Sequence, residues 1–141
     1  MDNKGNLTFT MIKPDAVLAG TSTAISKIIS EAGFKFRALK MTKLTQEQAE
    51  RFYSIHKDKP FFNELINFMT SGPIIAAIIE KENAVENFRE LIGATNPANA
   101  KESTIRKLYG TDNTKNAVHG SDCDENAIIE SNFFFSNLER Y

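Results

Sequence analysis

The segment NAVHGSDCDE, residues 116–125, places a histidine where it can do chemistry. His119 is one of only two histidines in the chain, and Gly120 leaves room beside its ring. Imidazole is the side chain whose ordinary pKa lies near neutrality, so an accessible ring is an uncharged nucleophile at cellular pH without a dedicated base. A solvated loop histidine is the alternative, because a single His-Gly pair is weak evidence. Other residues of the chain decide between these two interpretations.

Three cationic residues lie near the ends of predicted elements or in a long predicted loop, where they could gather around an anion. They are Lys13, Arg89 and Arg106. The planar fork of arginine suits phosphate oxygens. The same loop supplies uncharged hydrogen-bonding side chains, namely Thr95, Asn96, Thr104, Asn113 and Asn116. Taken singly, each cation also fits a solvated surface position, and the polar residues also favour turns.

Three further residues have both a chemical and a structural interpretation. Glu130 follows His119 by eleven positions on a predicted helix, so it could turn back to orient the imidazole or simply face solvent. Tyr53 points either toward a cleft or toward the edge of the core. Phe61 follows Pro60 and could stack on a nucleobase, although most of the eleven phenylalanines must build core.

The sequence lacks two common nucleotide-binding patterns and a structural metal pattern. It contains neither GxxxxGK[ST] nor GxGxxG, so a P-loop or Rossmann phosphate cradle is not supported. His56 and His119 have no clustered cysteines or paired histidines around them. Magnesium carried in by the phosphates of a substrate is the ion that suits such a chain.

The length of 141 residues predicts one domain, residues 1–141. Lys plus Arg total 17 against 18 Asp plus Glu, so a net charge of −1 gives no general attraction to nucleic acid or to an anionic membrane. The single cysteine, Cys123, cannot form an internal disulfide, which fits a reducing compartment. The N-terminus shows neither a signal peptide nor a membrane span, so we expect a cytoplasmic protein.

Alternating apolar residues predict two strands in the first third of the chain. Residues 7–12 alternate and must stop near Pro14, because proline lacks the N–H that a strand ladder needs, so Lys13 lies at a strand end. Residues 34–38 alternate in the same way before the register breaks near Leu39, which predicts a strand with a bulge.

Two more strands follow later in the chain. Residues 74–80, IIAAIIE, are apolar on both faces and predict a central buried strand. Val118 fits a short last strand that delivers His119. The predicted order of elements is β-α-β-α-α-β-α-loop-β-α, and the alternation suggests a sheet with one covered face.

Cap residues mark the predicted helices. Thr45 and Gln48 form a capping box, Asn83 with Glu86 predicts a second cap, and Gly33 is placed to end a helix. The helices are expected at about residues 21–32, 45–56, 61–69, 83–92, 103–108 and 124–133. The intervening residues 94–116 form a long excursion that is otherwise loop-like, and such connections are usually functional.

Taken together, the segments TMIKPDAV, DKPFF, SGPI, GATNP, STIR and NAVHGSD resemble the nucleoside diphosphate kinase family in their order and spacing. The resemblance covers essentially the whole chain. It implies an α+β fold, a ferredoxin-like α/β sandwich with a four-stranded antiparallel sheet covered by helices. It also implies ping-pong transfer of the γ-phosphate of a nucleoside triphosphate, usually ATP, to a nucleoside diphosphate.

The resemblance also implies a role for each matching residue. His119 matches the histidine that becomes phosphorylated, and Glu130 with Ser121 matches the group that orients its ring. The residues that match phosphate contacts are Lys13, Tyr53, Arg89, Thr95 and Arg106. Asn116 and Lys13 would meet the sugar hydroxyl, Phe61 would stack on the base with Leu65 lining that side, and Asp122 would reach substrate-borne Mg²⁺ through water.

Two positions depart from the pattern of the family. Asn113 stands where an aliphatic residue commonly faces the stacking phenylalanine, and Ala94 stands where glutamate is usual. The chain also ends at Tyr141, so it resembles bacterial members without a longer tail, which form homotetramers or homohexamers. Two alternatives follow from other classes of protein: a non-catalytic nucleotide-binding or scaffold module of the same fold, and a ferredoxin-like regulatory domain for another small ligand.

Overall fold

The computed structural model describes residues 5–141 and contains a four-stranded antiparallel sheet. Its strands lie in the order β2-β3-β1-β4, and every neighbouring pair is antiparallel. The strands are β1 (Leu7–Ile12), β2 (Lys35–Thr42), β3 (Ile74–Glu80) and β4 (Val118–Gly120). This arrangement confirms the expected α+β, ferredoxin-like sheet, with β3 as a central strand.

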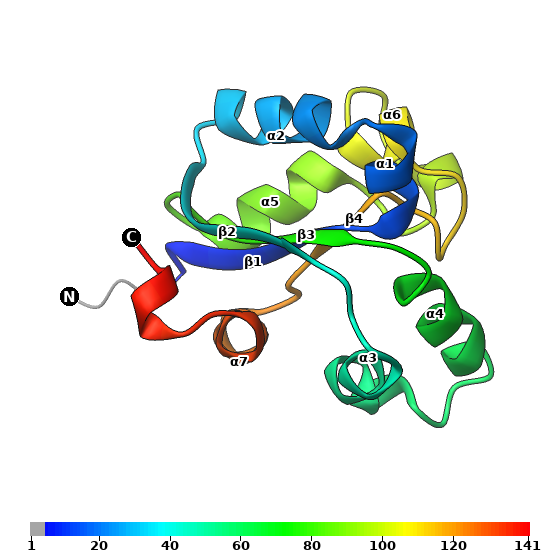
Figure 1. Ribbon diagram of the computed structural model, residues 1–141. Helices are drawn as coiled ribbons and strands as arrows, with labels where there is room; N and C mark the ends of the chain where they lie inside the picture. The colour runs from blue at the N-terminus through cyan, green and yellow to red at the C-terminus, as the bar shows by residue number, and fades with distance from the viewer. Residues whose placement is uncertain (1–4) are drawn as a thin grey trace.

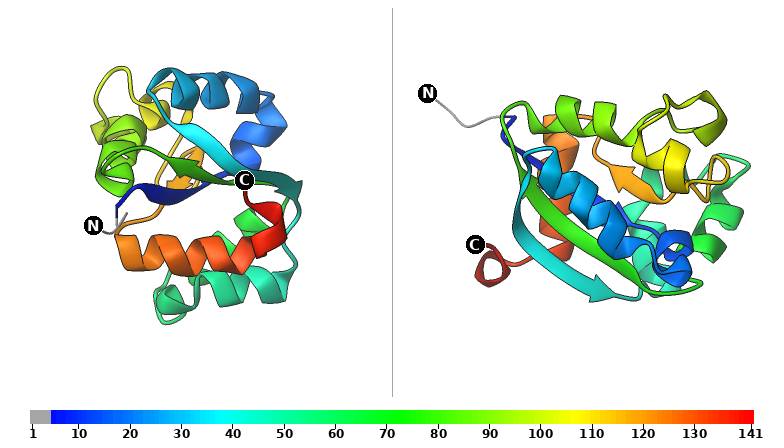
Figure 2. Two further views of the ribbon diagram at one scale, coloured as in Figure 1. Left: turned by 90° about the vertical axis from the view of Figure 1, so that its left-hand side faces the viewer. Right: turned by 90° about the horizontal axis from the view of Figure 1, so that it is seen from above.

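Helices pack on both sides of the sheet (Figure 1). Figure 2 shows α2 and α5 on one side, and α3 and α7 on the other. The helices are α1 (Pro14–Ala19), α2 (Ser22–Glu31), α3 (Gln46–Phe52), α4 (Phe62–Met69), α5 (Ala84–Ile92), α6 (Ile105–Tyr109) and α7 (Asp124–Phe134), with short 3-10 helices at Ser54–His56, Pro97–Asn99 and Asn137–Glu139. In the described part of the chain, no helix is long and apolar enough to cross a membrane.

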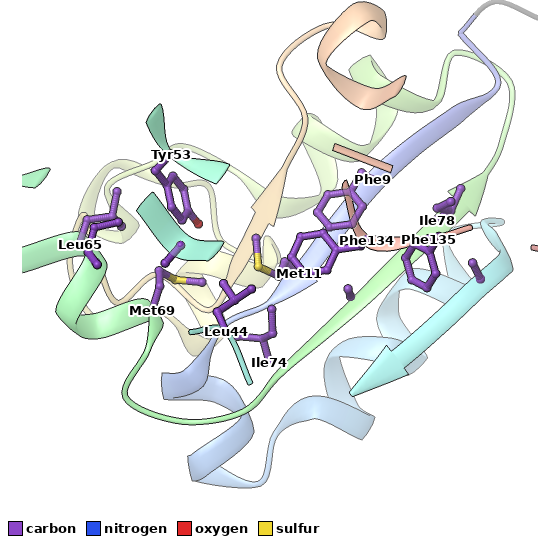
Figure 3. Close-up of a cluster of buried hydrophobic side chains, with 14 residues drawn as sticks. Phe9, Met11, Leu44, Tyr53, Leu65, Met69, Ile74, Ile78, Phe134 and Phe135 are labelled. Atoms are coloured by element: carbon purple, nitrogen blue, oxygen red, sulfur yellow. The ribbon is translucent and has the colours of Figure 1, made fainter. Parts of the chain in front are cut away.

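The sheet is buried on both faces, so the expectation of one covered face is wrong. Phe9 and Met11 pack with α3, α4 and α7 in one hydrophobic cluster (Figure 3). Ile79 packs with α1, α2, α5 and α6 in a second cluster on the opposite face. Thr8 and Thr10, which alternate with the apolar residues of β1, are only 0% and 1% exposed. Threonine suits a covered strand face as well as a solvated one, and this made the alternation misleading.

Helix α1 was not predicted. Pro14 is its first residue, Asp15 lies in its first turn, and Gly20 ends it with a φ of +79°. Proline ends a strand, but its fixed φ also suits the first position of a helix. A helix of six residues is too short to show the helical period in the sequence.

The predicted cap at the start of α5 is wrong as well. Asn83 precedes the helix with a φ of +51° and its side chain makes no capping bond, so Glu86 completes no capping box. The backbone N–H of Ala84 donates to the carbonyl of Gly5 instead. A contact from a distant segment therefore takes the place of a local cap.

Other local predictions are confirmed with small shifts. The bulge in β2 falls between Phe36 and Ala38, just before the predicted position. The helix predicted to reach His56 ends at Phe52 and continues as the 3-10 helix Ser54–His56. Residues 94–116 contain α6 where a short helix was expected, together with the 3-10 helix Pro97–Asn99.

The capping box of α3 gives a test of local stability. Thr45 accepts a hydrogen bond from the backbone of Gln48 at 3.1 Å, and the Gln48 side chain accepts from the backbone of Thr45 at 3.0 Å. We expect Thr45→Ala to lower the free energy of unfolding by about 1 kcal/mol, because the backbone N–H of Gln48 loses its side-chain acceptor. Urea denaturation measures the change. Thr111→Ala, at an exposed loop position, is the control and should leave stability nearly unchanged; equal losses in both variants would contradict the role of the cap.

Candidate active site

His119 lies in β4, an edge strand of the sheet, directly opposite Met11 of β1. The hydroxyl of Thr10 donates to the His119 carbonyl at 2.9 Å and so fixes the backbone at this point. The rings of Phe52 and Phe9 lie 5.5 and 6.0 Å from the imidazole centroid. The His119 side chain keeps 19% of its surface exposed. The imidazole is therefore held between aromatic rings and still accessible to a small substrate.

One nitrogen of this imidazole is held by a carboxylate on α7. Nε2 of His119 lies 2.8 Å from Oε1 of Glu130. The hydroxyl of Ser121, which is 1% exposed, donates to the same oxygen at 2.7 Å. Because an ionised carboxylate only accepts hydrogen bonds, Nε2 carries the proton and Nδ1 keeps a lone pair. The structure thus brings together the three residues that the sequence linked and leaves Nδ1 outside the hydrogen bond to Glu130.

Lys13 and Asn116 form a second group next to this histidine. Lys13 Nζ donates to Asn116 Oδ1 at 2.8 Å and to the Thr114 carbonyl at 3.4 Å. The Asn116 amide in turn donates to the carbonyls of Thr95 and Asn113, at 3.0 and 3.1 Å. Both Lys13 and Asn116 are buried. These bonds tie the long segment 94–116 to the end of β1.

Arg106 approaches the same place from α6. Its guanidinium donates to the carbonyls of Gly93 and Val118, at 3.1 and 2.9 Å, which puts it one residue from His119. Burial, and next the positive charge of Arg89, lowers the pKa of Arg106 to about 10. Burial, and next the charge of Arg106, lowers the pKa of Lys13 to about 8. These shifts reflect positive groups crowded together and partly shielded from water.

No carboxylate lies within ion-pair distance of these three cations in residues 5–141. The ion pairs of lysine and arginine are found elsewhere in this part of the chain, between Lys27 and Glu31, Arg37 and Glu80, and Lys40 and Glu139. Asp15 and Asp112 act on Lys13, and Asp122 on Arg89, only from beyond ion-pair distance. Crowded positive charges of this kind are unfavourable unless an anion joins them. The arrangement is suited to a ligand with several negative charges.

A cleft of about 860 Å³ opens beside this group, between α5 and residues 93–104. Arg89 and Asp122, both exposed, contribute to its wall. A hydrogen bond of 2.6 Å from the Asn126 amide lowers the pKa of Asp122. The full lining is Val85, Glu86, Arg89, Glu90, Gly93, Ala94, Asn99, Lys101, Ser103, Thr104 and Asp122. The cleft therefore adjoins the group around His119 and does not enclose it.

Three of the remaining predicted residues, Tyr53, Phe61 and Leu65, lie at α3 and α4. The hydroxyl of Tyr53 is buried without a hydrogen-bond partner, and burial, with Glu130 as the next cause, raises the pKa of the phenol. Phe61 keeps 43% of its surface exposed. Leu65 is 7% exposed and packs in the cluster of Figure 3, so it lies within the core and does not form an open wall. Asn113 is exposed, and the contact that it makes to Asn116 uses its carbonyl.

His56 was overlooked as a functional candidate. Its ring lies 6.5 Å from that of Tyr53 and 5.7 Å from that of Phe61, measured between centroids, and its Nδ1 is buried without a partner. The spacing of three residues from Tyr53 was the available signal, because such a spacing puts two side chains on one face of a helical turn.

Residues 5–141 contain no group of three or more His, Cys, Asp or Glu side chains that could hold a metal ion. Asp122, two residues after strand β4, is an acidic side chain of the cleft wall. A lone carboxylate suits an ion that brings most of its ligands with it, as Mg²⁺ bound to phosphates does.

A sequence profile of the nucleoside diphosphate kinases matches residues 6–140. The chain belongs to the nucleoside diphosphate kinase family. It is 57% identical to the nucleoside diphosphate kinase of Flavobacterium psychrophilum over 136 residues, 96% of this chain and 98% of that one. It is 54% identical to the nucleoside diphosphate kinase of Lawsonia intracellularis over 133 residues, 94% of this chain and 96% of that one.

Solved structures of nucleoside diphosphate kinases share the fold. The enzyme of Aquifex aeolicus superposes with a TM-score of 0.94 at 42% identity, covering 96% of this chain and 99% of that chain. The enzyme of Halobacterium salinarum, solved in complex with CDP, gives a TM-score of 0.91 at 37% identity, covering 97% and 91%. The chain is thus a phosphotransferase with nucleotide substrates.

The pKa of Lys13 predicts how nucleotide affinity depends on pH. Lys13 has a pKa of about 8, against an ordinary value of 10.5, so raising the pH through 8 removes its charge in the free enzyme. We expect the affinity for ADP to fall by up to about tenfold per pH unit above this value, because the anionic phosphates favour protonated lysine. Calorimetric titration between pH 7 and 9 measures the effect.

Lys13→Met should bind ADP weakly with little dependence on pH over this range. Lys27→Met, which changes an exposed lysine on α2, serves as the matched control and should retain the full dependence. A wild-type affinity that is flat from pH 7 to 9 would contradict the assignment.

Proposed function

We propose that the chain transfers the γ-phosphoryl group of a nucleoside triphosphate, usually ATP, through a phosphohistidine on His119. Nδ1 attacks the γ-phosphorus, a P–N bond forms, the bond to the β,γ-bridging oxygen breaks, and the diphosphate leaves. A terminal oxygen of a second diphosphate then attacks this phosphorus, and the P–N bond breaks. The observation that carries the proposal is the 2.8 Å contact of Nε2 with Glu130, because it leaves the Nδ1 lone pair as the nucleophile.

Glu130 and Ser121 act on the ring and make no contact with the phosphate. Glu130 stabilises the positive charge that the imidazole gains when Nδ1 bonds to phosphorus, as the third member of a catalytic triad does. Ser121 donates to the same oxygen of Glu130 at 2.7 Å and so holds the carboxylate in place.

The cations surround the phosphates. Lys13, Arg89 and Arg106 spread positive charge over the oxygens of the transferred group, which phosphoryl transfer requires above all. The hydroxyls of Thr95 and Tyr53 add donors, and the buried Tyr53 hydroxyl has no partner in the described residues, which supports this role. Asn116, held by Lys13, reaches the sugar hydroxyl together with that lysine.

A Mg²⁺ ion carried in by the substrate would neutralise part of the charge of the phosphates. Asp122 is the residue that would contact this ion, through a water molecule. Its exposed carboxylate lies in the cleft wall with Arg89, and its lowered pKa keeps it ionised.

The nucleobase stacks on the exposed ring of Phe61, with Leu65 beneath the same surface and Asn113 on the opposite side. Stacking uses the face of a base and leaves its edge unread, so poor discrimination among bases follows. The contacts to the sugar hydroxyl favour nucleotides over inorganic polyphosphates.

We also propose that residues 1–141 act as one domain in the cytoplasm, as part of a homotetramer or homohexamer. The exposed apolar side chains of Leu39 and Met41 on the edge strand β2 support self-association, because such edges are usually covered. The proposed assembly requires neither nucleic acid nor a membrane.

The phosphohistidine can be tested directly. Incubation of the pure protein with ATP and Mg²⁺ should give an acid-labile phosphoenzyme that any nucleoside diphosphate discharges. Alkaline hydrolysis followed by chromatography should recover the isomer phosphorylated on Nδ1, because Glu130 occupies Nε2. His119→Ala should form no adduct, whereas His56→Ala should still carry the label.

Labelling of His119→Ala would refute the proposal. Nucleotide binding without any adduct in the wild-type protein would favour the scaffold alternative. Recovery of the Nε2 isomer would show that the hydrogen bond to Glu130 breaks during the reaction and would overturn the stated role of that residue.

The stacking role of Phe61 predicts a uniform loss of affinity. Phe61→Ala should weaken the binding of ADP, GDP and CDP by similar factors, about 5- to 150-fold, since stacking contributes ~1–3 kcal/mol per base and is tolerant of base identity. Titration of the three diphosphates measures the loss. Phe61→Tyr keeps an aromatic face and is the control; a loss confined to one base would contradict the stacking role.

A further inference from the structure

Ala117, two residues before His119, has an unusual backbone conformation. Its φ is +75°, in the left-handed region, and the residue is completely buried. The N–H of Val118 donates to the Asn116 carbonyl at 2.9 Å, which closes a three-residue γ-turn around it. A γ-turn with positive φ is a rare and strained form, and alanine is a poor residue for it because its Cβ is crowded by the backbone. Such a conformation persists only where surrounding contacts hold it.

Both backbone groups of Ala117 are held by the junction of β1 and α1. The Ala117 N–H donates to Oδ2 of Asp15 at 3.1 Å. The Ala117 carbonyl accepts from the backbone N–H of Lys13 at 2.8 Å. Lys13 and Asp15, which are separated only by Pro14, therefore hold the strained turn through both backbone groups of Ala117. Of these two contacts, only the one made by the Asp15 side chain can be removed by a substitution.

The environment of Asp15 does not suit an ordinary helix-start residue. Its Oδ1 is buried without a hydrogen-bond partner in the described residues. Burial raises the pKa of the carboxyl, although the N–H of Ala117 acts in the opposite direction. An acid that served only the dipole of α1 would do so equally well in solvent. Partial burial of this carboxylate is unfavourable by itself. The hydrogen bond from the Ala117 N–H is therefore the favourable contact that its buried position provides.

The γ-turn connects two groups of the active site. Asn116 precedes Ala117 and places its amide between Lys13 Nζ and the carbonyls of the long segment. His119 follows at two residues. A change of φ at Ala117 from positive to negative would rotate one of these groups relative to the other, and phosphoryl transfer is sensitive to shifts of about 1 Å.

We propose that Asp15 is a positioning residue for the transfer reaction: its carboxylate holds Ala117 in the γ-turn and thereby sets Asn116 and Lys13 against His119. This role rests on the proposed phosphohistidine mechanism. Asp15 does not touch the reacting atoms, and its effect passes through the backbone of residues 116–118.

The test compares the rate of His119 phosphorylation by ATP and Mg²⁺ in single-turnover experiments, per titratable site. Asp15→Ala should slow this step by about 10- to 100-fold. Asp15→Asn retains an acceptor for the Ala117 N–H and should keep most of the rate. In the double variant Asp15→Ala with Ala117→Gly, glycine adopts positive φ without strain, so most of the lost rate should return. Glu47→Ala, an exposed acid in the first turn of α3, is the control for a general helix-start effect and should leave the rate unchanged.

A second readout does not depend on the reaction. Hydrogen exchange at the amide of Ala117 should accelerate in Asp15→Ala and stay slow in Asp15→Asn. This result stands even if His119→Ala still forms an adduct and the proposed function fails, so the two failures are distinguishable.

Three outcomes would overturn the proposal: a wild-type rate in Asp15→Ala, a double variant as slow as Asp15→Ala, or an Asp15→Asn variant as slow as Asp15→Ala. If Asp15→Ala does not fold, the double variant decides alone. A folded and fast double variant supports the role of the γ-turn, and a folded but slow one contradicts it.

Discussion

The active site depends on positive charge that the protein concentrates without an acidic partner at ion-pair distance. Lys13 and Arg106 are buried close enough for each to affect the other, and Arg89 adds a third charge. Backbone carbonyls take the place of carboxylates, with those of Gly93 and Val118 bound to Arg106. Carbonyl dipoles orient a cation without cancelling its charge, so the attraction for a polyanionic ligand is preserved. The long segment 94–116 adds the carbonyl of Thr114, which accepts from Lys13.

The sequence predicted the sheet well, and its errors have identifiable causes. The run of residues 74–80 was apolar on both faces, and such a run has few alternatives to a central strand. Thr8 and Thr10 misled because threonine tolerates both water and a covered face, and only tertiary packing decides which it meets. Helix α1 was missed because proline can end a strand and can also begin a helix. The start of α5 was misjudged because the carbonyl of the distant Gly5, and not the side chain of Asn83, accepts the hydrogen bond at the helix start.

The sequence indicated candidate site residues from their types and close neighbours. It did not indicate the contacts that they make with residues distant in the chain. His119 stands out through residue type and neighbours, and the cations through their place at element ends. The burial of Lys13 and the contact of Asp15 with Ala117 could not be predicted from the sequence, because both arise when residues about one hundred positions apart meet. Family resemblance indicated which residues take part, and the hydrogen bonds show how each is held. The proposal of Nδ1 as the nucleophile rests on the contact of Glu130 with Nε2.

The pairing of β1 with β4 has a consequence for how the molecule assembles. Thr10 lies opposite Gly120, so the first strand to leave the ribosome receives its edge neighbour only after most of the chain has been made. Helix α7, which covers Phe9 and carries Glu130, comes later still. Contacts between such distant segments form slowly, because the entropy of closing a long loop is lost before they are gained. During synthesis β1 therefore has an open side and an uncovered apolar face, and the contact of His119 with Glu130 forms only when α7 docks.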